Sequence, residues 1–125
     1  MPGYLVHSAD VPVVERGSAA WRVAIDERCG CPALKQAVIA FAPGRSTLEA
    51  EAGRERSLYV SSGRGSITLD GVEHALEPDT GVYLAPGAVG EIDVAGPDDL
   101  VVVAVDAPPP ASIIESWEFS FKTSR

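Results

Sequence analysis

Apolar and polar residues alternate in short runs along this chain, and glycine, proline or Asp-Gly pairs separate the runs. The clearest pair of runs covers residues 66–69 and 72–76, with Asp70-Gly71 between them. An Asp-Gly pair in this setting is a strong hairpin signal, because a two-residue type I′ turn needs positive φ at both central positions. The pattern therefore predicts an antiparallel β-hairpin here.

Further runs predict strands on both sides of that hairpin. They lie at residues 21–25, 34–41, 47–52, 57–60, 82–84, 91–94 and 100–105. The run 34–41 has a periodicity that also suits a helix, but its position directly before Pro43-Gly44 favours a strand. The run 100–105 is continuously apolar and rich in β-branched residues, which is typical of a strand buried on both faces. The sequence predicts an all-β protein.

The order of turns and strands divides the chain into three parts of one domain. Residues 1–33 form a lead-in of short strands and a loop, and residues 34–106 form the core. Residues 107–125 begin with a run of prolines, which predicts a stiff linker, and then form an amphipathic strand carrying Trp117 and two phenylalanines. An exposed aromatic face is typical of a protein–protein interface, so we expect a homodimer that buries it.

The order of turns and strands in residues 34–106 resembles that of the cupin family. In order it reads Pro-Gly, strand, turn, Tyr-Val strand, Gly-x-Gly, strand, Asp-Gly, strand, Glu-Pro, strand, Pro-Gly and strand. The resemblance implies a small antiparallel jelly-roll β-barrel. In cupins the same positions usually carry a metal centre.

The first cupin motif is a glycine, five residues, His-x-His, three or four residues, a glutamate, six residues and a glycine. Counting from Gly44 places its two histidines on Ala50 and Ala52, and counting back from Gly63 places its glutamate on Arg56. None of these three side chains is a metal ligand, so the family's site lacks its donors here.

The second motif ends in Pro-x-Gly, two residues and a histidine. That histidine falls on Gly90 if Gly87 is the motif's glycine, and on Glu91 if Pro86 is its proline. Neighbouring strand residues point to opposite faces, so only one of them looks into the barrel. A first-row metal site needs several converging His or carboxylate ligands. We therefore predict no metal and no other cofactor.

Arg56 is the residue whose placement separates the possible functions. Pointing inward, it would be a buried charge that needs a carboxylate or an anionic ligand. If the preceding turn is one residue looser, Glu55 takes the family position and Arg56 is solvated. Glu91 is a candidate general base or a partner of Arg56.

Three more polar residues are candidates for ligand contacts. Tyr59 and Tyr83 can donate phenolic hydrogen bonds, although aromatic packing is the more frequent role of a strand tyrosine. Gln36 lies on an otherwise apolar strand, where a buried amide needs partners. Together with Ala50, Ala52 and Gly90, whose small size is expected to leave room in the barrel, they form the predicted ligand-binding set.

Charge and composition narrow the class of partner. The chain has 18 acidic and 10 basic residues and a net charge of −8, which argues against nucleic acid and anionic membrane surfaces. No apolar run is long enough to span a bilayer, and the first residues do not form a signal peptide, so we expect a cytoplasmic protein.

Three functions fit a barrel without its metal. The first is a binder of a small organic molecule in the cavity, with an anion as one candidate ligand. The second is a metal-independent enzyme, a lyase, isomerase or cyclase acting on a biosynthetic intermediate through Arg56 and Glu91. The third is a structural or assembly subunit with a closed core.

Overall fold

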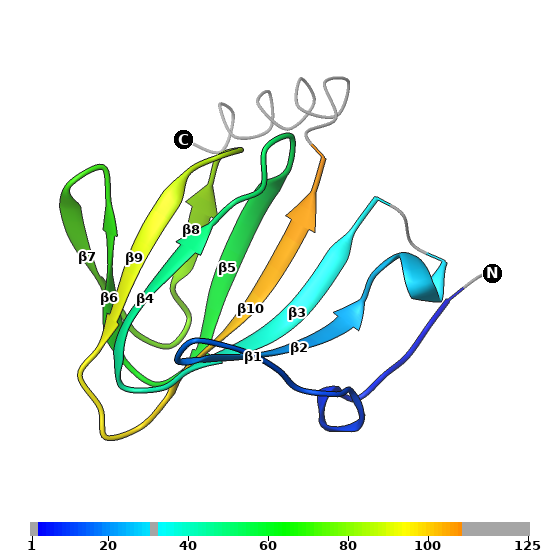
Figure 1. Ribbon diagram of the computed structural model, residues 1–125, viewed down its shortest axis with the longest axis horizontal. Helices are drawn as coiled ribbons and strands as arrows, with labels where there is room; N and C mark the ends of the chain where they lie inside the picture. Colours follow the sequence, from blue (N-terminus) through cyan, green and yellow to red (C-terminus); the bar gives the residue numbers. More distant parts are fainter. Residues whose placement is uncertain (1–2, 31–32, 109–125) are drawn as a thin grey trace.

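The computed structural model describes residues 3–30 and 33–108, which form ten β-strands and two short 3₁₀ helices (Figure 1). The strands are β1 (Val14–Arg16), β2 (Ala19–Ile25), β3 (Lys35–Phe41), β4 (Gly44–Glu49), β5 (Glu55–Ser62), β6 (Gly65–Leu69), β7 (Val72–Leu76), β8 (Gly81–Leu84), β9 (Val89–Val94) and β10 (Leu100–Ala107). The helices are η1 (Ser8–Asp10) and η2 (Glu27–Cys29). The all-β prediction is confirmed.

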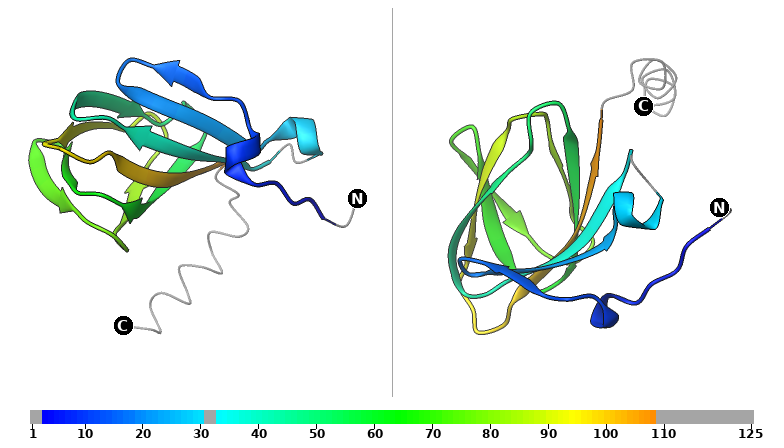
Figure 2. Two further views of the ribbon diagram at one scale, coloured as in Figure 1. Left: turned by 90° about the horizontal axis from the view of Figure 1, so that it is seen from below. Right: turned by 45° about the vertical axis from the view of Figure 1, so that its right-hand side comes forward.

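The strands form two antiparallel sheets that curve around a common interior (Figure 2). The six-stranded sheet has the order β1-β2-β3-β10-β5-β8, and the four-stranded sheet has the order β4-β9-β6-β7. Strands distant in sequence are neighbours in both sheets, as in a jelly roll. The sequence-based jelly-roll prediction is therefore confirmed.

The predicted Asp-Gly hairpin is present as β6 and β7. Leu69 pairs with Val72 across the turn, and Asp70 and Gly71 have φ of 49° and 78°. The two positive φ angles are those that the type I′ turn requires. This turn fixes the register of the hairpin and brings Ile67 to face the interior, where it is fully buried.

Alternation along the strands builds one hydrophobic core between the sheets. Its buried members are Ala19, Ile39, Phe41, Leu48, Ala50, Leu58, Val60, Ile67, Leu76, Leu84, Ile92, Val94, Leu100, Val102 and Ala104. Within residues 3–30 and 33–108, no buried side-chain nitrogen or oxygen lacks a hydrogen-bond partner. The interior of the barrel is thus packed and its polar groups are satisfied.

Several predicted bounds differ from the structure; for example, β4 spans Gly44–Glu49, whereas residues 47–52 are predicted. β10 continues through Asp106 to Ala107, beyond the predicted end of the strand at residue 105, and only one of its faces is fully buried while the other is half-buried. The lead-in also belongs to the barrel, because β2 pairs with β3 from Ala19 to Ile25. The core alternation simply extends further at both ends than the apolar residues alone indicate.

The predicted C-terminal strand, which carries Trp117, falls within residues 109–125, outside the described part of the chain. Among the residues that are described, no helix is long and apolar enough to cross a membrane.

Candidate functional site: a basic cleft beside a buried ion pair

Gly90 faces the interior of the barrel, and its neighbour Glu91 is exposed on the outer face of β9. These are the two possible positions of the histidine in the second cupin motif. A Cβ atom on Gly90 would lie 2.7 Å from Cδ1 and 3.1 Å from Cγ1 of Ile67. The Ile67 side chain therefore occupies the space that a larger residue at position 90 would need. Glu91 does not enter the barrel, so its predicted role as partner of Arg56 is wrong.

The first-motif positions offer no metal donors either. Ala50 is buried in the core, whereas Ala52 lies after the end of β4 and is exposed. Among the described residues, no three His, Cys, Asp or Glu side chains gather closely enough to hold a metal ion. The residues at the cupin metal position therefore do not fit a metal, and the expected empty space there is filled by packing.

We expect Gly90→Ala to destabilise the protein by about 1–3 kcal/mol, because the new methyl group overlaps Ile67 in a packed core. Ile67→Val removes the atom that lies closest to it. The double variant is therefore expected to be more stable than the sum of the two single effects implies, as a double-mutant cycle of urea unfolding would measure. If the two single effects on the free energy of unfolding simply add, the close contact between positions 67 and 90 is contradicted.

Arg56 points inward from β5, and both it and Asp106 of β10 are only 4% exposed. The Nε and Nη2 atoms of Arg56 donate to the two carboxylate oxygens of Asp106 at 2.6 and 2.8 Å. Its Nη1 atom donates to the carbonyl oxygen of Glu49 at 3.1 Å. The guanidinium is held by both sheets, in the bidentate geometry that makes such pairs strong.

Trp21 of β2 connects this ion pair to the edge of the six-stranded sheet. The guanidinium carbon of Arg56 lies 5.4 Å from the centre of the indole ring, and that of Arg16 lies 5.6 Å from it. Both distances are within the range of cation–π attraction. Arg16, Trp21 and Arg56 thus form a row across β1, β2 and β5.

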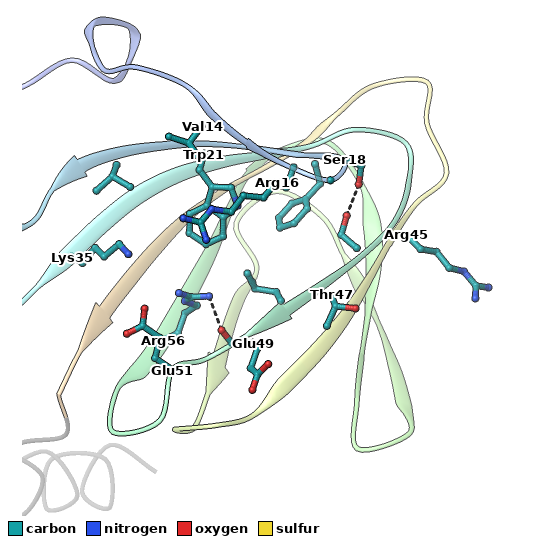
Figure 3. A pocket seen from close by; sticks show the side chains of 16 residues that line it. Val14, Arg16, Ser18, Trp21, Lys35, Arg45, Thr47, Glu49, Glu51 and Arg56 are labelled. Carbon is teal, nitrogen blue, oxygen red and sulfur yellow. Dashed lines mark hydrogen bonds between the residues drawn. The ribbon is translucent and has the colours of Figure 1, made fainter.

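A cleft of about 510 Å³ opens beside this row, between the β1–β2 hairpin and β4 (Figure 3). Its lining residues are Val14, Arg16, Gly17, Ser18, Ala19, Trp21, Val23, Lys35, Phe41, Arg45, Ser46, Thr47, Leu48, Glu49, Glu51 and Arg56. The Ser18 and Ser46 hydroxyl groups lie 2.6 Å apart and join the hairpin to β4. Their hydrogen bond links the two walls of the cleft.

The lining of the cleft is richer in basic residues than the rest of the protein. Four of the ten basic residues line it, but only two of the eighteen acidic residues do. Arg45 extends away from the cleft in Figure 3. Its Nε atom lies 3.5 Å from a carboxylate oxygen of Asp93, which does not line the cleft. Arg16, Lys35 and Arg56 remain as the basic groups of the interior part, and Arg56 is already paired with Asp106.

The remaining sequence-predicted ligand residues lie elsewhere. Tyr59 and Tyr83 are 49% and 59% exposed on the outer face of the six-stranded sheet, so they do not donate into the interior. Tyr83 donates to Glu55 at 2.6 Å, and Tyr59 donates to Asp79. These carboxylates favour the neutral phenols and raise the pKa of both tyrosines. Gln36 is half-buried on β3 and does not line the cleft.

Sequence reasoning missed Trp21, Lys35 and Asp106 as parts of the site. The prolines that follow Asp106 predict the end of the barrel at this residue. The signal for it was present, since Leu100, Val102, Ala104 and Asp106 continue one period-two face of β10. An acidic residue on a buried face needs a cation, and Arg56 was the candidate.

No family model matches this chain, and no curated protein matches it in sequence. Solved structures do match it. An ectoine synthase from P. lautus superposes with a TM-score of 0.73 and 15% identity, over 91% of this chain and 86% of that one. The polyketide cyclase RemF from Streptomyces resistomycificus gives 0.73 and 18% identity, over 86% and 82% of the two chains.

A solved cupin domain also superposes on this chain. The Cupin_2 domain of a transcriptional regulator from Enterobacter cloacae superposes with a TM-score of 0.63 and 23% identity, over 74% of this chain and 99% of that one. At these identities the similarity establishes the architecture and not the chemistry. Together with the jelly-roll topology, it shows that this chain has the cupin fold.

Proposed function

We propose that this protein binds a small organic anion in the cleft between the β1–β2 hairpin and β4, without a metal at the cupin position. The observation that carries the proposal is Arg56, a permanent cation that lines the cleft from a buried ion pair. Asp106 and the Glu49 carbonyl accept three of its five N–H donors. Among residues 3–30 and 33–108, its other two N–H donors have no hydrogen-bond partner.

The shape and lining of the cleft support a small molecule as the ligand. A volume of about 510 Å³ lies within the usual range of roughly 300–1,000 Å³ for such sites. Apolar groups of Trp21, Phe41 and Leu48 lie beside the basic groups. An anion bound there gains both burial of its carbon skeleton and a charge-assisted hydrogen bond.

The test is calorimetric titration of the full-length protein, after treatment with a metal chelator, with a panel of organic acids, their neutral amides and the matching amines. We expect the acids alone to bind, with an affinity that falls as salt is added, because the site attracts negative charge. Binding of the neutral amides as tightly as the acids would contradict the proposal.

A second candidate function is that of a metal-independent lyase, isomerase or cyclase. The structural neighbour RemF is described as a polyketide cyclase. The observation that favours it is that Glu51 lines the same cleft as Lys35, which places a base and an acid around one ligand. Conversion of a bound acid, followed by NMR, is then expected to stop in Glu51→Gln while binding persists. Conversion that continues in Glu51→Gln would contradict this role.

A further inference from the structure

Lys35 is the one lysine among the described residues, and it occupies a special position in the barrel. On β10, Asp106 is flanked by two cross-strand neighbours, Arg56 on β5 and Lys35 on β3. Directly opposed residues of neighbouring strands share a face of the sheet. Arg56 and Lys35 therefore both belong to the inward-facing side, with one carboxylate between them.

Asp106 does not neutralise both cations. Each of its carboxylate oxygens accepts a hydrogen bond from Arg56, at 2.6 and 2.8 Å. Among residues 3–30 and 33–108, Lys35 has no carboxylate oxygen within 4.0 Å of its ammonium nitrogen, although its side chain is half-buried. Figure 3 shows the Lys35 side chain extending from β3 toward Trp21. This half-buried charge is the one that a ligand can best compensate.

We infer that Lys35 binds the carboxylate of an amphipathic monocarboxylic acid, an aliphatic or aromatic acid whose carbon skeleton lies along the apolar part of the cleft. This inference rests on the proposed function and gives it a ligand class and a residue that determines specificity. One ammonium group matches one carboxylate. Val23 and Trp21 line the same cleft and give an apolar skeleton a surface to pack against.

The backbone of the cleft favours a carboxylate over a phosphate. Phosphate sites are commonly built on helix N-termini or glycine-rich loops that present several N–H groups. The cleft lining comes from strands β1 to β5 and the turns between them, and neither 3₁₀ helix contributes to it. The hydroxyl groups of Ser18 and Ser46 are already bonded to each other.

The experiment compares Lys35→Met and Lys35→Arg with the wild-type full-length chain, using hexanoate, phenylacetate and 4-phenylbutyrate as probes. Hexanamide tests the charge, succinate tests a second carboxylate, and inorganic phosphate tests the anion class. Arg64→Met is the matched control, because Arg64 is exposed, pairs with Glu77 at 3.0 Å and lies outside the cleft. Calorimetry gives the affinities, and unfolding of each variant shows whether it is folded.

We expect Lys35→Met to weaken binding of the three acids about tenfold or more, the effect of losing one charge-assisted hydrogen bond. Arg64→Met should bind as the wild type does, and Lys35→Arg should retain more affinity than Lys35→Met because it keeps the positive charge. Succinate and phosphate should bind more weakly than hexanoate. Equal affinities for wild type and Lys35→Met, or tighter binding of succinate or phosphate, would overturn this inference while leaving the anion-binding function intact. If no acid binds the wild type, the proposed function itself fails.

Discussion

Replacing Arg56 by methionine is expected to lower the free energy of unfolding by about 3–5 kcal/mol, one of the two largest effects that we predict for a single substitution in this protein. Methionine fills a similar volume but leaves the Asp106 carboxylate buried at 4% exposure without its two charged donors. Urea unfolding followed by circular dichroism measures the loss.

Two controls separate the buried pair from a general effect of removing an arginine. Arg64→Met removes an exposed ion pair with Glu77, which is worth about 0–1 kcal/mol. Adding Asp106→Leu to Arg56→Met removes the orphaned carboxylate as well, so much of the lost stability should return. A loss in Arg56→Met no larger than that in Arg64→Met would mean that the ion pair does not support the fold.

Replacing Gly63 by alanine is expected to lower the free energy of unfolding by about 3 kcal/mol or more, or to prevent folding. The new Cβ atom would lie 2.2 Å from the carbonyl oxygen of Asp99 and 2.8 Å from the Cα atom of Leu100. Both are backbone atoms, and Leu100 is fully buried, so neither can move aside cheaply. The positive φ of Gly63, 85°, adds about 1–2 kcal/mol for any L-residue.

Gly53→Ala is the matched control for this prediction. Gly53 has almost the same φ, 80°, but a Cβ atom there would meet nothing within 4 Å. The Gly53→Ala substitution should therefore lower the free energy of unfolding only by the cost of a positive φ in an L-residue, about 1–2 kcal/mol. Thermal unfolding of both variants tests the difference. Equal losses would show that the close approach of Gly63 to Asp99 is not a constraint on the barrel.

The turns and the direction of the strand faces could be predicted from the sequence because they depend on neighbouring residues. Asp70-Gly71 specifies a type I′ turn locally, and the alternation around it specifies which side chains face inward. The same reasoning identified Arg56 as a possible inward charge. It left open whether Glu55 takes that position, and the structure places Arg56 inside and Glu55 at an intermediate depth.

The partners of these residues could not be predicted, because they depend on contacts between distant strands. Arg56 and Asp106 are 50 residues apart and meet only because β5 pairs with β10. Ile67 fills the space beside Gly90 because β6 pairs with β9. The room expected beside Gly90 is therefore absent, since the Ile67 side chain from another strand fills it.

The most direct test of the cleft as an organic-anion site is an NMR titration of the ¹⁵N-labelled full-length protein with hexanoate, phenylacetate and 4-phenylbutyrate. Binding in the cleft predicts that the indole N–H signal of Trp21 and the backbone amide signals of Lys35 and Leu48 move most, with those of Tyr59 and Tyr83 on the outer face nearly unchanged. The opposite distribution, or spectra that do not change with any of the three acids, would contradict the assignment of this cleft as an organic-anion site.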